Sequence, residues 1–226
     1  MLTLTATVQT FIDMKILNLY ACLGGNRYKW NEVNNDIEVT AIELDLEAAR
    51  LYQERFPNDK VIVADAHQYL LYHYKEFDFI WSSPPCPTHS RARFARRETT
   101  SAEYPDLKLY EEVLFLENWF NGKYVVENVI PYYEPLIPAQ KRGRHLYWTN
   151  FNLPNNLNER KSSIMEGKDE VTQWCEFHDY NFRQYKGEQR VDKMARNLVD
   201  YEAGKTIFET ALGIISKSKT EQTYLF

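Results

Sequence analysis

The chain has 226 residues, enough for one domain with at most a small additional lobe. Hydrophobic residues make up 44% and aromatic residues 15% of it, which excludes an intrinsically disordered chain. Its 27 Lys and Arg against 32 Asp and Glu give a net charge of -5. This balance excludes a generally basic protein that coats nucleic acid, so any nucleic-acid surface must be local.

The number of cysteines and the hydropathy of the chain indicate the cellular compartment of the protein. The chain has three cysteines, Cys22, Cys86 and Cys175, which is a small and odd number for a disulfide framework. No Cys or His spacing resembles a zinc site. No stretch approaches the ~18 uninterrupted apolar residues of a membrane span, and the amino-terminal residues lack the pattern of a secretion signal. We therefore expect a soluble, cytoplasmic protein without a bound metal.

Short apolar runs alternate with longer segments of helical spacing in the first two thirds of the chain. Helices are predicted over residues 45–56 and 104–120. Strands are predicted over residues 15–21, 37–44, 60–64, 77–82, 124–129 and 145–151. This alternation predicts an α/β fold, namely a doubly wound, Rossmann-like and mostly parallel sheet with helices on both faces.

The composition divides the chain into unequal parts. We expect residues 1–14 to be an extension and residues 15–151 to form the main domain. Residues 152–188 are rich in Asn, Pro, Lys, Glu and Gly, which predicts a loop-rich insertion or small lobe. Amphipathic spacing returns over 191–215, so residues 189–216 are expected to pack back on the main domain as one helical stretch, and 217–226 read as a polar tail.

Three strand ends carry residues suited to a nucleoside. Gly24 and Gly25 allow a tight turn after the first strand, although an ordinary strand-to-helix turn is an alternative because GxGxxG is absent. Glu43 ends the second strand, where a carboxylate can accept both ribose hydroxyls. Asp65 ends the third and is placed to bind an adenine amino group. Asp45 and Asp65 can each instead be helix N-caps.

The fourth strand stops at Pro84 and Pro85, which cannot continue a strand ladder, so Cys86 is presented at a rigid turn. A basic loop follows it. Cationic neighbours lower the pKa of a thiol and increase the nucleophilic thiolate fraction. We expect this effect on Cys86 from the loop arginines, namely Arg91, Arg93, Arg96 and Arg97. The alternatives are a buried, inert cysteine and a solvated surface loop.

The fifth strand ends in Glu127, flanked by valines. Apolar surroundings favour a protonated carboxyl that can donate a hydrogen bond to a base nitrogen. A structural ion pair with Arg142 or Arg144 is the alternative. These two arginines open the sixth strand, and we expect them to face opposite sides, one toward the site.

Taken in order, these motifs resemble those of the cytosine carbon-5 methyltransferases over residues 15–150. The motifs are the run from Tyr20 to Gly25, Glu43, Asp65, Pro85 with Cys86, the run from Glu127 to Val129, and the run from Gln140 to Arg144. The segment from Arg196 to Ile207 is similar to the family's closing motif, without its usual proline. The region where the family carries its target recognition domain is unusually short here.

The resemblance implies a class I methyltransferase fold and S-adenosylmethionine as the methyl donor, with S-adenosylhomocysteine as product. The implied cofactor residues are Tyr20, Leu23, Gly24, Gly25, Glu43, Leu44, Asp65, Ala66, Pro85, Asn197 and Leu198. The implied catalytic residues are Cys86, Glu127, Arg142 and Arg144, and Ser90 joins the loop arginines in binding nucleic acid. Cys86 would add to carbon 6 of a flipped cytosine, Glu127 would bind ring nitrogen 3, and Arg144 would hold the carbonyl.

The resemblance favours double-stranded DNA as partner and a monomeric orphan enzyme of a bacterium or its phage. RNA methylation remains open, because the transfer-RNA branch of the family also carries Pro-Pro-Cys. The run from Ser83 to Pro85 is also similar to the motif of amino-methyltransferases, but Cys86 replaces their aromatic residue. A small-molecule methyltransferase and a catalytically silent binding module are further alternatives.

Overall fold

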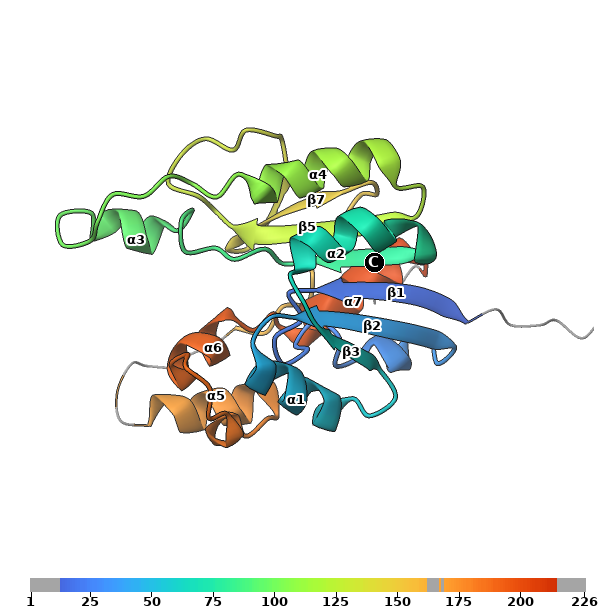
Figure 1. Cartoon of the computed structure of the whole chain (residues 1–226), viewed down its shortest axis with the longest axis horizontal. Coiled ribbons are helices and arrows are strands. Elements are labelled where there is room, and N and C mark those ends of the chain that lie inside the picture. The colour runs from blue at the N-terminus through green and yellow to red at the C-terminus, as the bar shows by residue number, and fades with distance from the viewer. Residues whose placement is uncertain (1–12, 162–166, 168, 215–226) are drawn as a thin grey trace, which may run out of the picture.

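A single mixed sheet organises the protein (Figure 1). The computed structural model describes residues 13–161, 167 and 169–214. The strands are β1 (Met14–Leu19), β2 (Ile37–Glu43), β3 (Lys60–Val63), β4 (Phe79–Ser82), β5 (Lys123–Val129), β6 (Gln140–Arg142) and β7 (His145–Thr149). Their order is β3-β2-β1-β4-β5-β7-β6. Strands β1 to β5 are parallel and β7 is antiparallel to both neighbours, which confirms the predicted doubly wound, mostly parallel fold.

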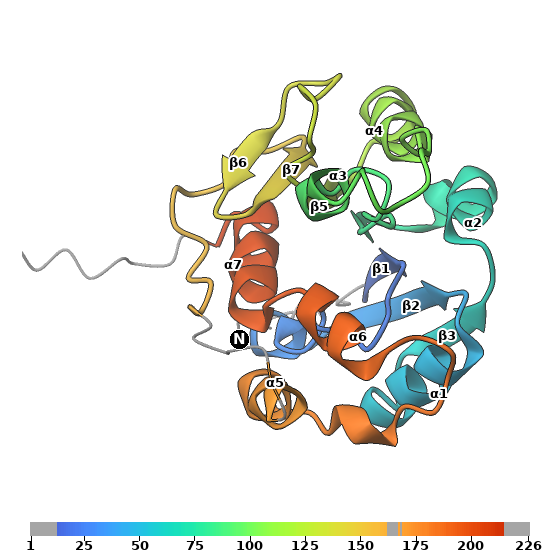
Figure 2. The ribbon, with the colours of Figure 1, turned by 90° about the vertical axis from the view of Figure 1, so that its left-hand side faces the viewer.

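Helices cover both faces of this sheet (Figure 2). They are α1 (Leu46–Arg55), α2 (Ala66–His73), α3 (Arg91–Ala95), α4 (Lys108–Trp119), α5 (Glu170–His178), α6 (Val191–Asn197) and α7 (Tyr201–Ala211), with short 3-10 helices at Trp30–Glu32, Tyr74–Glu76 and Phe182–Gln184. Helices α2 and α4 pack on one face, and α1 and α7 on the other. In these described ranges, no helix is long and apolar enough to cross a membrane.

Strand pleating distributes the apolar residues between two cores. In β1, Leu17 and Leu19 pack with Leu116 of α4. Ile16, the residue just before Leu17, faces the other side of the sheet and packs with Phe208 of α7. A parallel strand buried on both faces reads as a continuous apolar run, and this is why the sequence identified the central strands.

The predicted boundaries need two corrections. Met14 already pairs in β1, so the strand begins inside the predicted extension, of which residues 1–12 lie outside the described residues. The predicted helical stretch over 191–215 is two helices, because Asp200 caps the start of α7 by accepting from the backbone N–H of Glu202 and Ala203 at 2.9 and 3.2 Å. Residues 215–226, including the predicted tail, lie outside the described part.

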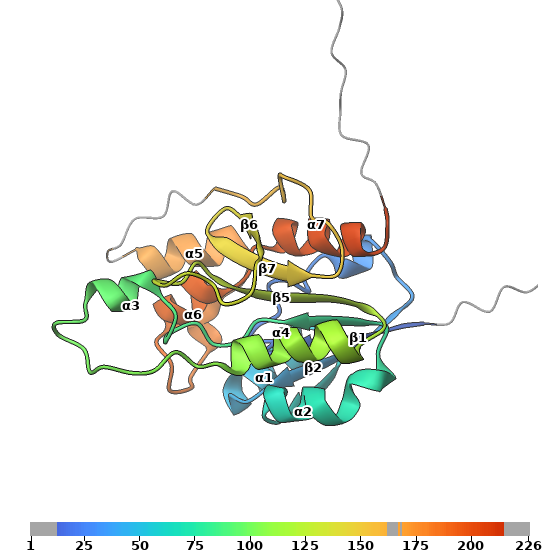
Figure 3. The same cartoon turned by 90° about the horizontal axis from the view of Figure 1, so that it is seen from above.

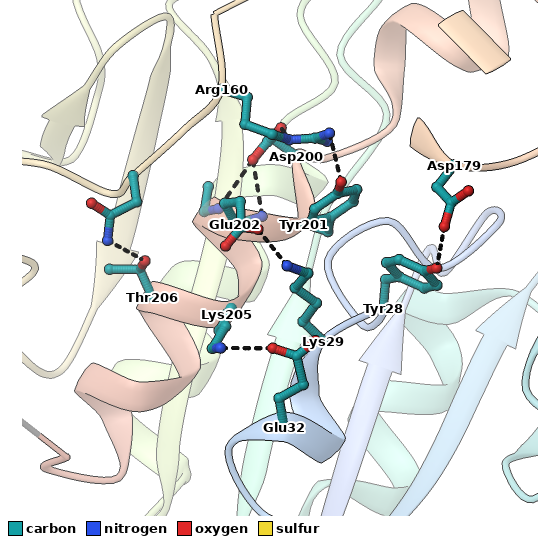
Figure 4. Close-up of polar contacts among 12 residues, drawn as sticks. Tyr28, Lys29, Glu32, Arg160, Asp179, Asp200, Tyr201, Glu202, Lys205 and Thr206 are labelled. Carbon is teal, nitrogen blue, oxygen red and sulfur yellow. Dashed lines mark hydrogen bonds and ion pairs between the residues drawn. The ribbon is translucent and has the colours of Figure 1, made fainter. Parts of the chain in front are cut away.

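Polar contacts fasten the segment after β7 to the start of α7 (Figure 4). Arg160 Nε donates to Asp200 Oδ2 at 2.8 Å, and its guanidinium lies 3.5 Å from the ring centroid of Tyr201. Lys29, which follows the turn after β1, pairs with Glu202 at 2.5 Å. The start of α7 is therefore held against the turn after β1 and the segment after β7.

Candidate active site

Strands β1 to β5 run in one direction, so the segments that leave their carboxyl ends converge at one edge of the sheet. This edge faces the viewer in Figure 2. Figure 3 shows that α3 projects beyond the sheet at the same end at which α5 and α6 lie. Most of the predicted site residues belong to these segments.

The turn after β1 is tightly packed against the closing segment. Cys22 and Gly24 adopt φ values of 46° and 69°, in the left-handed region. A Cβ on Gly25 would lie 2.4 Å from the carbonyl oxygen of Val199 and 2.5 Å from Cγ of Leu198. The structure thus brings the predicted glycine turn into direct contact with the predicted closing residues, and only glycine permits that approach.

The carboxylates at the strand ends have different roles. Glu43 Oε2 accepts from Cys22 N at 2.7 Å, and its Oε1 accepts from Asp45 N at 2.8 Å. Burial raises the pKa of Glu43, against the lowering effect of these two backbone hydrogen bonds. Asp45 caps α1 and Asp65 caps α2, so the N-cap alternative is confirmed for both. Asp65 is nevertheless exposed at the tip of β3.

The other predicted cofactor residues differ in exposure. Leu44 is 70% exposed although it is apolar, and it stands next to Glu43. An exposed large apolar side chain beside a carboxylate is a surface suited to a planar ring. Pro85 and Asn197 are exposed, whereas Leu23, Ala66 and Leu198 are buried.

The segment that carries Cys86 is anchored to the neighbouring strand. Asn128 of β5 donates through Nδ2 to the carbonyl oxygen of Pro84 at 2.9 Å. The carbonyl oxygen of Cys86 accepts from the backbone N–H of His89 and Ser90 at 3.0 and 3.1 Å. These contacts hold the half-buried thiol at the junction of β4 and β5.

The predicted activation of Cys86 by the loop arginines is wrong. Burial raises the pKa of the Cys86 thiol, and the Glu127 carboxylate raises it further. Among the described residues, a backbone hydrogen bond of Cys86 and the charge of Lys193 on α6 lower it. Proximity in the sequence did not predict this, because the loop arginines have partners of their own, whereas Lys193 belongs to a helix far along the chain.

The loop arginines engage local partners instead. Arg91 Nε donates to the Pro131 carbonyl oxygen at 3.0 Å, and Arg93 pairs with Glu103 at 2.5 Å. The exposed Arg96 donates through Nε to the Ala92 carbonyl oxygen at 3.3 Å. The guanidinium of the exposed Arg97 lies 4.9 Å from the centroid of the Phe94 ring. Ser90, another predicted nucleic-acid contact, caps α3 by accepting from Ala92 N at 3.2 Å. The loop therefore keeps exposed positive charge at Arg91, Arg96 and Arg97.

Glu127 is 7% exposed, and its Oε1 lies 3.5 Å from Nε2 of His145. The alternative of an ion pair with Arg142 or Arg144 is wrong, because Arg142 donates to the carbonyl oxygens of Pro154 and Leu153 at 2.6 Å. The expectation that the two arginines face opposite sides of one strand is also wrong. The chain turns at Gly143, with φ 54°, so Arg142 ends β6 and the exposed Arg144 precedes β7.

One buried residue at this edge escaped the sequence analysis. Glu112 of α4 is 1% exposed and contacts three other polar side chains, Tyr20, His67 and Ser82. Its position on the helix was a usable signal. Glu112 falls on the same stripe as Leu109 and Leu116, where an amphipathic helix otherwise carries apolar residues.

Comparison with known proteins identifies the family model that the chain matches. Residues 14–129, just over half of the chain, match the model described as C-5 cytosine-specific DNA methylase. The match begins with β1 and ends with β5, so it includes the glycine turn, Cys86 and Glu127. No curated protein matches the sequence.

Solved structures of methyltransferases match parts of the chain. A mutant DNMT2 of Spodoptera frugiperda is 24% identical over 51% of this chain and 35% of its own, with a TM-score of 0.38. A protein encoded within a prophage of E. coli is provisionally described as a DNA modification methyltransferase. It is 18% identical over 54% of this chain and 33% of its own, with a TM-score of 0.37. The plantazolicin methyltransferase BpumL, in complex with SAH, is 14% identical over 51% and 39%, with a TM-score of 0.35. These matches span less than half the length of each relative.

Proposed function

The chain belongs to the C-5 cytosine-specific DNA methylase family, and we propose that it methylates carbon 5 of cytosine in DNA through a covalent adduct with Cys86. The observation that carries the proposal is the proximity of Cys86, four residues after the end of β4, to Glu127 on the adjacent strand β5, where the Glu127 carboxylate raises the pKa of the thiol. A thiol and a carboxyl at one strand edge are the two groups that addition to a pyrimidine requires.

The residues at the ends of β1 to β3 fit S-adenosylmethionine as methyl donor. Two backbone N–H groups occupy the Glu43 carboxylate, which has about four lone-pair positions and so retains capacity for ribose hydroxyls. The exposed Leu44 offers a surface for the adenine ring, and the exposed Asp65 can accept its amino group. When bound, S-adenosylmethionine supplies the electrophilic methyl group.

The chain's own residues supply the rest of the chemistry. The Cys86 thiolate adds to carbon 6 of cytosine, forming a sulfur–carbon bond, and the electron pair moves through carbon 5 toward nitrogen 3. Protonated Glu127 donates a hydrogen bond to nitrogen 3 and offsets the developing charge. Arg144 holds the pyrimidine carbonyl, and Arg142 positions it by anchoring the preceding strand. After methylation, solvent water accepts the proton from carbon 5. The electron pair of that bond forms the double bond between carbons 5 and 6 again, and the sulfur–carbon bond breaks to release the Cys86 thiolate.

Nucleic acid reaches this site by extrusion of the target base, which costs a few kcal/mol of stacking. The basic loop with Ser90, Arg91, Arg93, Arg96 and Arg97 is the proposed clamp, consistent with its position next to Cys86. Residues 152–188 are the proposed, reduced target-recognition region, and the active unit is the monomer. A short recognition region predicts low sequence selectivity.

Transfer of a labelled methyl group to separate pools of DNA and RNA tests this proposal. We expect incorporation into DNA, with 5-methylcytosine as the product. Cys86→Ser should abolish transfer while S-adenosylhomocysteine still binds, because serine is a much weaker nucleophile at neutral pH. Cys175→Ser, which changes another free thiol on α5, is the matched control and should retain transfer.

The outcomes separate the alternatives. Incorporation into RNA alone would replace DNA by RNA as substrate. Full activity of Cys86→Ser would eliminate the covalent mechanism. Failure of the unmodified protein to form an adduct with DNA that contains 5-fluorocytosine, despite binding of S-adenosylhomocysteine, would favour a silent binding module.

A further inference from the structure

The carboxylate of Glu112 contacts side chains from three segments that border the proposed S-adenosylmethionine site. Its Oε1 accepts from Tyr20 OH at 2.6 Å and lies 3.0 Å from Nδ1 of His67. Its Oε2 accepts from Ser82 Oγ at 2.6 Å. The Glu112 side chain is fully buried, so both oxygens depend on these partners for the hydrogen bonds that water would otherwise make.

Each partner occupies a position next to a proposed functional residue. Tyr20 is the first residue of the glycine turn after β1. His67 lies in the first turn of α2, two residues after Asp65. Ser82 is the last residue of β4, four residues before Cys86. One carboxylate therefore joins the adenosine side of the site to the strand that presents the nucleophile.

The backbone at Tyr20 gives independent evidence of a constrained position. Its φ is 55°, in the left-handed region that a bulky residue rarely adopts. Such conformations persist where surrounding contacts enforce them, and they gather at functional sites. The 2.6 Å hydrogen bond to Glu112 and packing against the apolar core beneath α2 and α4 both fix the position of the Tyr20 ring.

The charge of the cluster depends on His67. Its Nδ1 faces Glu112 at 3.0 Å and its Nε2 faces Glu111 at 3.2 Å. A neutral imidazole has a single N–H and can donate to one carboxylate, whereas imidazolium donates to both. The Glu112 hydrogen bond raises the pKa of His67, with Glu111 acting in the same direction and Lys108 opposing it.

We propose that Glu112 is a positioning residue that sets the S-adenosylmethionine turn against the strand leading to Cys86. This inference rests on the proposed function. Stability alone does not require a carboxylate at this place, because apolar side chains of similar volume often replace buried ionic groups without loss. A carboxylate does what an apolar residue cannot, since it fixes two hydroxyl groups and one imidazole relative to each other.

Binding of S-adenosylhomocysteine, measured by calorimetry on the full chain, and methyl-transfer kinetics test the inference together. Glu112→Gln keeps the shape but removes the charge, and we expect affinity and kcat both to fall by about 5-fold or more. Tyr20→Phe should act mainly on affinity, and Ser82→Ala mainly on kcat. Glu117→Gln, an exposed glutamate one and a half turns further along α4, is the matched control and should match the unmodified protein.

A second readout uses pH. Affinity for S-adenosylhomocysteine should decline as pH rises through the raised pKa of His67, because deprotonation removes one of its two donated hydrogen bonds. His67→Asn, which keeps one neutral donor, should abolish this dependence. The charged groups that face His67 are Glu111, Glu112 and Lys108.

The outcomes distinguish this inference from the proposed function. If the unmodified protein fails to bind S-adenosylhomocysteine, the proposed function fails and the inference with it. If the unmodified protein binds and Glu112→Gln, folded by circular dichroism, equals Glu117→Gln in affinity and kcat, the positioning role is refuted. Equal effects of Tyr20→Phe and Ser82→Ala on both parameters would also refute it, because they would indicate general destabilisation.

Discussion

Gly25→Ala provides a direct test of the contact between the glycine turn and the closing segment. The new Cβ would lie 2.4 Å from the Val199 carbonyl oxygen and 2.5 Å from Leu198 Cγ, against an ordinary contact of 3.4–4 Å. Because the Val199 atom belongs to the backbone, no rotamer change relieves the clash. Overpacking of this kind costs about 1–3 kcal/mol, partly offset by about 0.4–1 kcal/mol from the lower entropy of the unfolded chain.

A net loss of about 1–2 kcal/mol should lower Tm by roughly 2–8 °C for a chain of this size. The turn and the closing segment both border the proposed cofactor site, so the affinity for S-adenosylhomocysteine should fall as well. Gly122→Ala is the matched control, because its Cβ would meet the Asp78 carbonyl oxygen at 2.3 Å before β5, at the opposite end of the sheet. Equal affinities of the two variants, or an unchanged Tm of Gly25→Ala, would refute the reasoning.

Further predictions concern the thiol and the basic loop. Alkylation of Cys86 by iodoacetamide, followed by peptide mass spectrometry, should accelerate as pH rises through its raised pKa. Glu127→Gln removes a charge that raises this pKa, so at fixed pH it should speed alkylation yet slow methyl transfer by about 100-fold or more; parallel changes in the two rates would contradict separate roles. Arg96→Ala should reduce the slope of log affinity for DNA against log salt by about one. Arg93→Ala should reduce it less, because Arg93 is already paired with Glu103, and the reverse order would show that the clamp is misassigned.

The sheet could be predicted because its strands can be recognised from the order of apolar residues in the sequence. All six predicted strands are present with ends within about two residues, since strands buried on both faces appear as apolar runs. Strand ends then located Glu43, Asp65 and Glu127, because parallel strands end at a common edge. The short strand β6 was merged with β7, because nothing in three polar residues distinguishes a strand from a turn.

Contacts between segments distant in the chain were not predictable in this way. The side chain whose charge lowers the pKa of Cys86 is Lys193, 107 residues away, whereas the sequence points to arginines nearer in the chain. The break between α6 and α7 depends on the capping of one helix by Asp200 and on the packing of Leu198 against Gly25. Helical periodicity continues through such a break, because spacing records which residues are apolar and carries no information on the direction of the helix axis.

The electrostatics of Cys86 and Glu127 bear on how the proposed reaction begins. The proposed productive state has an ionised thiol and a protonated carboxyl, while the carboxylate form of Glu127 opposes ionisation of the thiol. In the proposed reaction, a carboxyl that donates to ring nitrogen 3 of cytosine carries no charge, so it no longer opposes ionisation of the thiol. The nucleophile is then generated mainly when a base occupies the site. Under the proposed mechanism, the thiol of the free protein would stay protonated, and so less open to oxidation, until a base binds.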